Sequence, residues 1–272
     1  MKIVDIKELE NIAKKARKNI IEQVYEASSG HPGSSLSCVD ILTVLYFNQM
    51  NIDPENPKME DRDKLILSKG HASPALYSIL AQRGFFPEEE LKEFRKLGSR
   101  LQGHPDVKKL PGIDMSAGSL GQGLSSACGI ALASRLKKQE NRVYCVLGDG
   151  ELQEGQIWEA AMTASHYKLN NLCVIVDNNN LQIDGTVDKV MNPYPIDEKF
   201  KSFGFEVFKV DGHNIENLVE VLEETKNIKE QPVVIIANTI KGKGVSFMEN
   251  KAEWHGKAPN EEEYNIAISE LI

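Results

Sequence analysis

The sequence has no run of about 20 apolar residues, the length that a membrane-spanning helix requires. Its first 19 residues carry charges throughout and lack the apolar core of a secretory signal. The four cysteines form no CxxC pair, and none lies beside a histidine at ligand spacing, so we interpret them as reduced thiols of the core. These absences predict a soluble cytoplasmic protein that does not contact a membrane.

Basic residues are fewer than acidic ones. Lysine and arginine number 32 against 40 aspartate and glutamate residues, which gives a formal net charge of −8. Because nucleic-acid binders present basic patches, this balance argues against nucleic acid as a partner, although it leaves room for a local phosphate pocket. No GxGxxG sequence follows the first expected strand, and this argues against a nicotinamide-binding Rossmann enzyme.

Continuous apolar runs alternate with segments of helical periodicity. Expected strands cover residues 64–68, 143–147, 172–176, 206–210 and 233–237. Expected helices cover residues 5–27, 36–50, 74–83, 120–136, 154–167 and 214–226, with a further helix opening at Pro87, and 98–119 is a long loop. Apolar strands separated by helices predict a largely parallel sheet with helices on both faces, in one α/β domain spanning residues 1–272.

Two polar motifs follow neighbouring expected strands. Gly148-Asp149-Gly150 comes directly after one strand, and Asp177-Asn178-Asn179-Asn180-Leu181 ends the next. Adjacent parallel strands bring their carboxyl ends together, where ligands of open α/β sheets bind, so Asp149 and Asn179 are expected to lie side by side. A carboxylate facing an anionic ligand needs a cation between them, and a hard divalent metal takes oxygen ligands from both sides.

Histidines concentrate in glycine- and proline-bearing loops. Four of the six have this setting: His31, His71, His104 and His255. Glycine permits close approach of backbone to a ligand, and histidine can donate, accept and change charge near neutral pH. His166 and His213 are interpreted as structural, the latter as holding a loop between a strand and a helix.

These motifs together resemble the amino-terminal half of transketolase. The GDG motif, followed after some 25 residues by an asparagine pair, is similar to the thiamine diphosphate fingerprint, and all four histidine contexts resemble that family in order, as do 116–124, 151–155, 183–185 and 210–213. The resemblance covers residues 10 to 260. It implies that Asp149, Asn179 and the backbone carbonyl of Leu181 coordinate Mg²⁺ or Ca²⁺ and thereby hold thiamine diphosphate. The run of three asparagines departs from the family pattern, so Asn178 and Asn180 stay open as ligands.

The resemblance also implies roles for the loop residues. His71 and Gly150 would contact the cofactor diphosphate, and Gly118, Ser119 and Leu120 would line the diphosphate and the pyrimidine amino group. His31, His104 and His255 would be catalytic, bonding ketose hydroxyls and shuttling protons, and His255 would also contact the cofactor. Glu154 matches a glutamate that joins a carboxylate network across the subunit interface of the family.

The family supplies a second, pyrimidine-binding domain, and this chain ends at Ile272, soon after the last matching motif. The expectation is therefore the N-terminal subunit of a split transketolase, which transfers a two-carbon ketol unit between sugar phosphates and works with a separate C-terminal subunit in a heterotetramer. Two alternatives are a deoxyxylulose phosphate synthase-like enzyme acting on another sugar and a non-catalytic cofactor-binding subunit.

Overall fold

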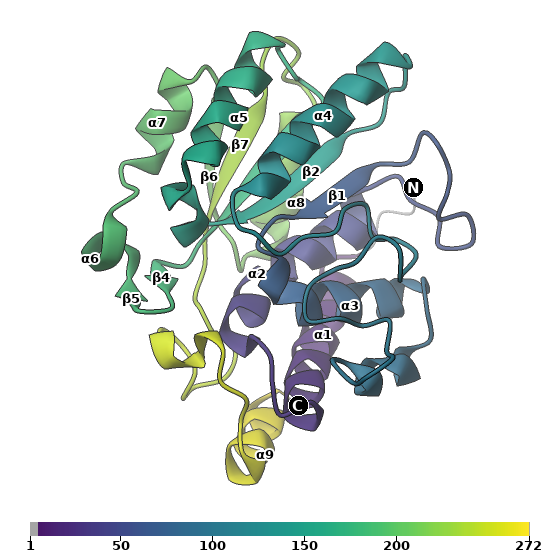
Figure 1. Ribbon diagram of the computed structural model, residues 1–272, viewed down its shortest axis with the longest axis vertical. Helices are drawn as coiled ribbons and strands as arrows, with labels where there is room; N and C mark the ends of the chain where they lie inside the picture. The colour runs from purple at the N-terminus through teal and green to yellow at the C-terminus, as the bar shows by residue number, and fades with distance from the viewer. Residues whose placement is uncertain (1–4, 272) are drawn as a thin grey trace.

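The computed structural model describes residues 5–271 and places a five-stranded parallel sheet at the centre of the chain (Figure 1). The strands lie in the order β1-β2-β3-β7-β6, and every neighbouring pair is parallel. Their bounds are β1 Lys64–Leu67, β2 Val143–Gly148, β3 Leu172–Asn178, β6 Glu206–Asp211 and β7 Val233–Asn238. All five expected strands are present, and the predicted parallel α/β fold is confirmed.

Helices cover both faces of this sheet. They are α1 Ile6–Glu26, α2 Pro32–Val44, α3 Ser73–Arg83, α4 Gln122–Leu136, α5 Gly155–His166, α6 Val187–Met191, α7 Ile196–Ser202, α8 Ile215–Thr225 and α9 Glu261–Glu270. Short segments complete the chain: the π-helix η1 Leu45–Gln49, the 3-10 helices η2 Gly70–Ala72, η3 Glu88–Glu93, η4 Gly150–Gln153 and η5 Ala252–His255, and the antiparallel hairpin of β4 Leu181–Gln182 and β5 Gly185–Thr186. Within residues 5–271, no helix has the length and apolar character needed to cross a membrane.

Alternate strand residues point into two separate cores. Val146 and Ile175 pack with α1, α2, α3 and α8, whereas Cys145 and Val174 pack with α4, α5 and α7. Because both faces are covered, the strands are apolar at every position, and this explains the continuous runs in the sequence. Each fully buried aliphatic side chain contributes roughly 1.5–3 kcal/mol through the hydrophobic effect.

Two expected helices differ from the structure. The helix expected from Pro87 is only the 3-10 helix η3, and Arg95 soon after it has φ of 59°, which a continuing α-helix does not allow. The helix expected over 36–50 begins earlier, at Pro32, because proline suits the first helical turn, and it ends in the π-helix η1. The hairpin β4–β5 and the helices α6, α7 and α9 were not predicted.

The fold gathers the sequence motifs at the carboxyl ends of the strands. Gly148, the last residue of β2, pairs with Asp177 of β3, and Asp177 pairs in turn with Ala237 of β7. The segments that follow β1, β2, β3 and β7 therefore emerge along one edge of the sheet. This is the edge at which open α/β sheets bind ligands.

Candidate active site

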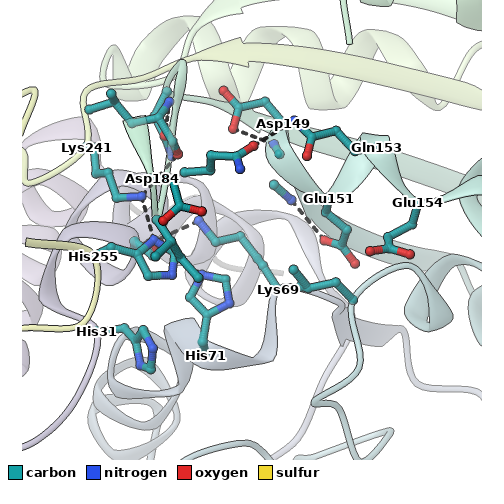
Figure 2. Close-up of a pocket in the computed structure, with 18 of the residues that line it drawn as sticks. His31, Lys69, His71, Asp149, Glu151, Gln153, Glu154, Asp184, Lys241 and His255 are labelled. Atoms are coloured by element: carbon teal, nitrogen blue, oxygen red, sulfur yellow. Dashed lines mark hydrogen bonds between the residues drawn. The ribbon is translucent and has the colours of Figure 1, made fainter. Parts of the chain in front are cut away.

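A cavity of about 300 Å³ lies at this edge of the sheet (Figure 2). Side chains from segments far apart in the sequence converge on it, from the start of α2 to η5. Its lining includes most of the residues singled out from the sequence, namely His31, His71, Gly118, Leu120, Asp149, Gly150, Asn179, Leu181 and His255. Two are not in this lining: Ser119 lines an adjoining recess that shares Gly118, and His104 is exposed nearby.

Asp149 and Asn179 lie at the tips of neighbouring strands and share the cavity. The Asp149 carboxylate accepts hydrogen bonds from the Gly150 amide at 2.8 Å and from the Asn180 amide, so the loop after β3 folds onto it. Asn179 Oδ1 accepts a hydrogen bond from the Leu181 amide at 3.1 Å. Of the three consecutive asparagines, Asn178 and Asn180 bond the hydroxyl of Tyr194, and only Asn179 lines the cavity.

Burial shapes the electrostatics of Asp149, which is 2% exposed. Burial and the neighbouring carboxylate of Asp177 raise the pKa of Asp149 to about 6. Asp149 makes no salt bridge within residues 5–271, so its negative charge has no direct partner there. A buried carboxylate in this position gains from a bound cation.

The donor set at these strand tips fits a hard metal ion. It offers a carboxylate from Asp149, an amide oxygen from Asn179 and the backbone carbonyl of Leu181, all oxygens of the kind that Mg²⁺ and Ca²⁺ take. Residues 5–271 hold no group of three or more His, Cys, Asp or Glu side chains that could bind a metal. The Leu181 carbonyl accepts from Lys241 Nζ at 3.1 Å, and its second lone pair remains for a ligand.

Lys69 is a buried cation that the sequence interpretation missed. It is 1% exposed, and Nζ bonds the Asp177 carboxylate and the Ser34 carbonyl, the latter at 3.1 Å. Although burial opposes its charge, Asp177 raises the pKa of Lys69. Asp177 also accepts from Ser37 Oγ at 2.6 Å and from Thr239. Lys69 lines the cavity and brings positive charge to it.

Three imidazoles form one wall of the cavity (Figure 2). The ring centroids of His31, His71 and His255 lie 5.0–5.3 Å apart, although the three residues belong to separate segments. His71 Nε2 lies 3.0 Å from the hydroxyl of Ser34. Burial lowers the pKa of His31 to about 4 and that of His255 to about 3, with the nearby cations adding to the effect, so these rings are neutral at pH 7.

Lys241 lies behind this wall and was also missed. It is 1% exposed, and its Nζ is 2.8 Å from His255 Nδ1. Burial lowers the pKa of Lys241 to about 8. The sequence around it, Ile240-Lys241-Gly242-Lys243-Gly244, offers one clue, the glycine that follows the lysine. In the structure Gly242 has φ of 80°, and a Cβ at this position would lie 2.4 Å from the Met248 carbonyl oxygen. The glycine thus marks a tight loop next to the buried lysine.

Two glutamates occupy different positions beside the cavity. Glu151 is 2% exposed and accepts hydrogen bonds from Ser68 Oγ and from the amides of Gly121 and Gly148, at 2.9 and 3.0 Å. It therefore ties the loop before α4 to the end of β2. Glu154 is exposed at the cavity lining, on the same side as Glu151 (Figure 2).

The remaining histidines lie outside the cavity lining. His213 Nδ1 is 2.7 Å from the Asp40 carboxylate, and its Nε2 accepts from the Ile240 amide at 2.8 Å, so it joins α2 to the segment after β7. His166 packs edge-on against Tyr167, with centroids 4.9 Å apart. Neither residue is proposed as part of the active site.

Comparison with known proteins identifies the family. Residues 9–271 match the family described as transketolase, thiamine diphosphate binding domain. The chain belongs to this family. It is 44% identical over 264 residues to the 6-deoxy-6-sulfo-D-fructose transketolase subunit of Clostridium sp. strain MSTE9, with 97% of this chain and 96% of that protein covered. It is 40% identical to an apulose-4-phosphate transketolase subunit of Phocaeicola vulgatus, with 98% and 95% covered.

Solved transketolases share the fold but are longer. The chain superimposes on transketolase from Campylobacter jejuni with a TM-score of 0.93 and 36% identity, which covers 98% of this chain and 43% of that one. A Pichia stipitis transketolase in complex with sedoheptulose 7-phosphate gives a TM-score of 0.91 and 30% identity, with 97% and 40% covered. The chain thus spans less than half of these transketolases and nearly all of the separate subunits. The expectation of a transketolase thiamine diphosphate-binding subunit is confirmed.

Proposed function

We propose that this chain is the cofactor-anchoring subunit of a two-subunit transketolase that moves a two-carbon ketol unit from a ketose to an aldose. The observation that carries the proposal is the convergence of Asp149, Asn179 and three imidazoles on one cavity at the carboxyl edge of the sheet. The kinship with named transketolase subunits supports the same activity.

Thiamine diphosphate would be held by its charged tail. Asp149, Asn179 and the Leu181 carbonyl would bind Mg²⁺, which would in turn neutralise the diphosphate. The Gly150 amide region and His71 would contact the diphosphate, and buried Lys69 and Lys241 would add positive charge around it. Gly118 and Leu120 line the same cavity, and Ser119 lines the recess beside it. When bound, thiamine supplies the electron sink that allows a carbon–carbon bond of the sugar to break.

The protein's own groups would orient the sugar and manage protons. His31 and His255 lie in the cavity lining, where they can bond hydroxyl and carbonyl oxygens of a ketose. His104 lies outside that lining, but a Cβ on Gly118 would come within 4.0 Å of its Cγ, so it stands at the border of the site. All three are proposed as catalytic residues, with His104 on the side open to solvent.

A partner chain would complete the enzyme. The relatives that this chain matches nearly end to end are named as subunits, and the matched transketolases contain more than twice its length. We propose that the partner is a C-terminal, pyrimidine-binding subunit, and that two copies of each chain form a heterotetramer. In that arrangement Glu154, exposed at the cavity lining, would face the second copy.

The substrate class follows from the relatives. The cavity lining carries both signs of charge, with Lys69 and Lys241 beside Asp149, Glu151, Glu154 and Asp184, and Arg95 borders it through His31. The relatives are named for a sulfonated ketose and for a phosphorylated one. We propose an anionic sugar of this kind.

Reconstitution tests the proposal. The chain is purified alone and together with the partner chain that co-purifies with it, loaded with Mg²⁺ and thiamine diphosphate, and mixed with a short aldose phosphate acceptor. The donors are 6-deoxy-6-sulfofructose, apulose 4-phosphate and sedoheptulose 7-phosphate, and mass spectrometry follows the shortened and extended products. We expect transfer by the assembly only.

Three outcomes contradict different parts of the proposal. Transfer by the isolated chain contradicts the need for a partner. Failure of the assembly to bind thiamine diphosphate contradicts the cofactor site. Cofactor binding without transfer from any of the three donors contradicts the proposed substrate class. The assembly carrying Asp149→Asn serves as the matched inactive control.

A further inference from the structure

Two histidines of the cavity lining each have a cation within hydrogen-bond distance of a ring nitrogen. Lys241 Nζ lies 2.8 Å from Nδ1 of His255, and Arg95 Nη2 lies 3.4 Å from Nδ1 of His31. The two cations come from different parts of the fold, one after β7 and the other after η3. In both cases the ring nitrogen next to the cation is Nδ1.

Both cations are held in place by further contacts. Lys241 is buried, and its Nζ also donates to the Leu181 carbonyl at 3.1 Å. Arg95 donates from Nη1 to Ser29 Oγ at 2.6 Å. Gly103 packs against its guanidinium so closely that a Cβ at this position would lie 2.9 Å from Arg95 Nε. Neither cation is a mobile surface side chain.

The hydrogen bonds that the two cations can make determine which nitrogen of each imidazole carries the proton. A lysine ammonium and an arginine guanidinium carry only donors and cannot accept a hydrogen bond. Nδ1 of each ring must therefore be the acceptor and carry no proton, and the single proton of the neutral imidazole must lie on Nε2. For His31, Nε2 lies toward the loop of His255, because a Cβ on Gly256 would be 3.6 Å away.

We propose that Lys241 and Arg95 are positioning residues that fix His255 and His31 as neutral imidazoles with the proton on Nε2. Nε2 is then the hydrogen-bond donor of each ring, and neither ring can accept a proton at the nitrogen that the cation covers. They suit oxygen acceptors, such as the carbonyl and hydroxyl oxygens of a sugar.

This assignment separates the roles of the three proposed catalytic histidines. His31 and His255 act as fixed donors. The ring of His104 makes no hydrogen bond to any of residues 5–271, so it remains the ring that can take up and release protons. This division of labour rests on the proposed function, whereas the proton positions do not.

Nitrogen NMR tests the proton positions on the full chain. The protein is labelled with ¹⁵N-histidine, long-range proton–nitrogen correlations are recorded at pH 6.5, below the pKa of about 8 of Lys241, and His31→Asn and His255→Asn assign the signals. We expect both rings to be neutral with the proton on Nε2. A proton on Nδ1 of either ring in the unmodified chain overturns the proposal for that residue, whatever the variants do.

Paired variants test the cause. Lys241→Met should convert His255 into a mixture of tautomers without changing His31, and Arg95→Met should do the reverse. The conservative changes Lys241→Arg and Arg95→Lys keep a donor and should preserve the Nε2 proton. Lys243→Met is the control, because Lys243 lies two residues from Lys241 but pairs with Glu249 at 3.4 Å and should change neither ring. An unchanged His255 signal in folded Lys241→Met overturns the role of Lys241.

Kinetics of the assembled enzyme add a second measurement. Lys241→Met should lower kcat at least tenfold with less change in KM, and Lys241→Arg should restore most of it. A merely structural lysine would be replaced equally poorly by both residues. Absence of ketol transfer from the unmodified assembly overturns the proposed function, while the NMR result on the isolated chain still decides the tautomers.

Discussion

The two ends of the central strands bury similar sets of charges in different surroundings. At the amino ends, the carboxylate of Asp63 accepts from the amides of Asn51 and Arg142 at 2.8 and 2.7 Å, and Arg62 forms a two-point ion pair with Asp114. At the carboxyl ends, Asp149 has two amide bonds and, among the described residues, no cation as direct partner. Asp63 likewise has no cation as direct partner among residues 5–271, and Lys69 pairs with Asp177 at the carboxyl end, so each end holds one ion pair and one aspartate bonded by two amides. What differs is that Asp149 and Lys69 line a cavity, whereas Asp63 and Arg62 do not.

The difference shows which buried charges serve folding alone. The amino-end groups bond backbone that links β1, β2 and the preceding loop, and they lie outside the lining of the active-site cavity. Asp149 and Lys69 line that cavity, together with imidazoles that burial and nearby cations keep neutral. Because only the carboxyl-edge groups converge on a cavity, a ligand explains their arrangement better than stability alone does.

The largest effect should come from breaking a buried ion pair at either end. Arg62→Met and Lys69→Met each remove the nearest cation of a buried carboxylate, that of Asp114 and that of Asp177, and should lower the free energy of unfolding by about 3–5 kcal/mol. Urea denaturation measures this. Only Lys69→Met should also weaken binding of Mg²⁺–thiamine diphosphate, which calorimetry on folded protein measures.

An exposed pair provides the control for that comparison. Lys15→Met removes the ion pair with Glu88, whose side chains are 53% and 39% exposed, and should cost less than about 1 kcal/mol. Equal losses for Lys15→Met and Lys69→Met would contradict the importance of burial. Equal losses of cofactor affinity for Arg62→Met and Lys69→Met would contradict the functional difference between the two ends.

The second-largest effect is expected from replacing two aspartates that each accept hydrogen bonds from two backbone amides. Asp149→Asn and Asp63→Asn both lose one acceptor, and each should cost about 1–3 kcal/mol of folding free energy. Asp149→Asn should in addition lower affinity for Mg²⁺–thiamine diphosphate by more than roughly 100-fold, beyond the loss typical of residues that only support metal ligands. Titration calorimetry measures the affinity, and unchanged binding by Asp149→Asn contradicts the metal site.

Much of the fold could be predicted because a sheet that is buried on both faces leaves a recognisable apolar pattern in the sequence. Strands covered on both faces must be apolar throughout, so β2, β3 and β7 were located to within two residues of their ends. The convergence of Asp149 and Asn179 followed from parallel pairing alone. Short elements such as β4–β5 were missed, because a two-residue strand has no periodicity to detect.

The site could be predicted only where glycine or a strand end marks it. Sequence analysis did not identify three cations of the site: Lys69, Lys241 and Arg95. Lysine and arginine are usually exposed to solvent, and whether one is buried depends on partners that lie far away in the sequence. Lys69 meets Asp177 across 108 positions, and Arg95 meets His31 across 64. Such pairs exist only in the folded chain, so their chemistry was visible only there.

The smallest effect is a difference in pH dependence carried by His31 and His255. Their rings take up a proton near pH 6.5 in the unfolded chain but only near 4 and 3 in the folded chain, because burial and nearby cations disfavour the charged ring. The folded state therefore binds fewer protons below pH 6.5. The stability that these neutral rings contribute is complete above pH 6.5 and is lost as the pH falls toward 4.

A comparison of two denaturation curves isolates this contribution. The free energy of unfolding of the double variant His31→Asn/His255→Asn is subtracted from that of the unmodified chain at each pH between 7 and 4. The difference should fall with decreasing pH, by at most about 1.4 kcal/mol per pH unit for each histidine. Asp149, whose pKa is raised to about 6, titrates in the same range with the opposite sign, and the subtraction removes it because both chains contain it. A flat difference would mean that the two rings are hydrated as freely in the folded chain as in the unfolded one, which contradicts their partial burial next to cations.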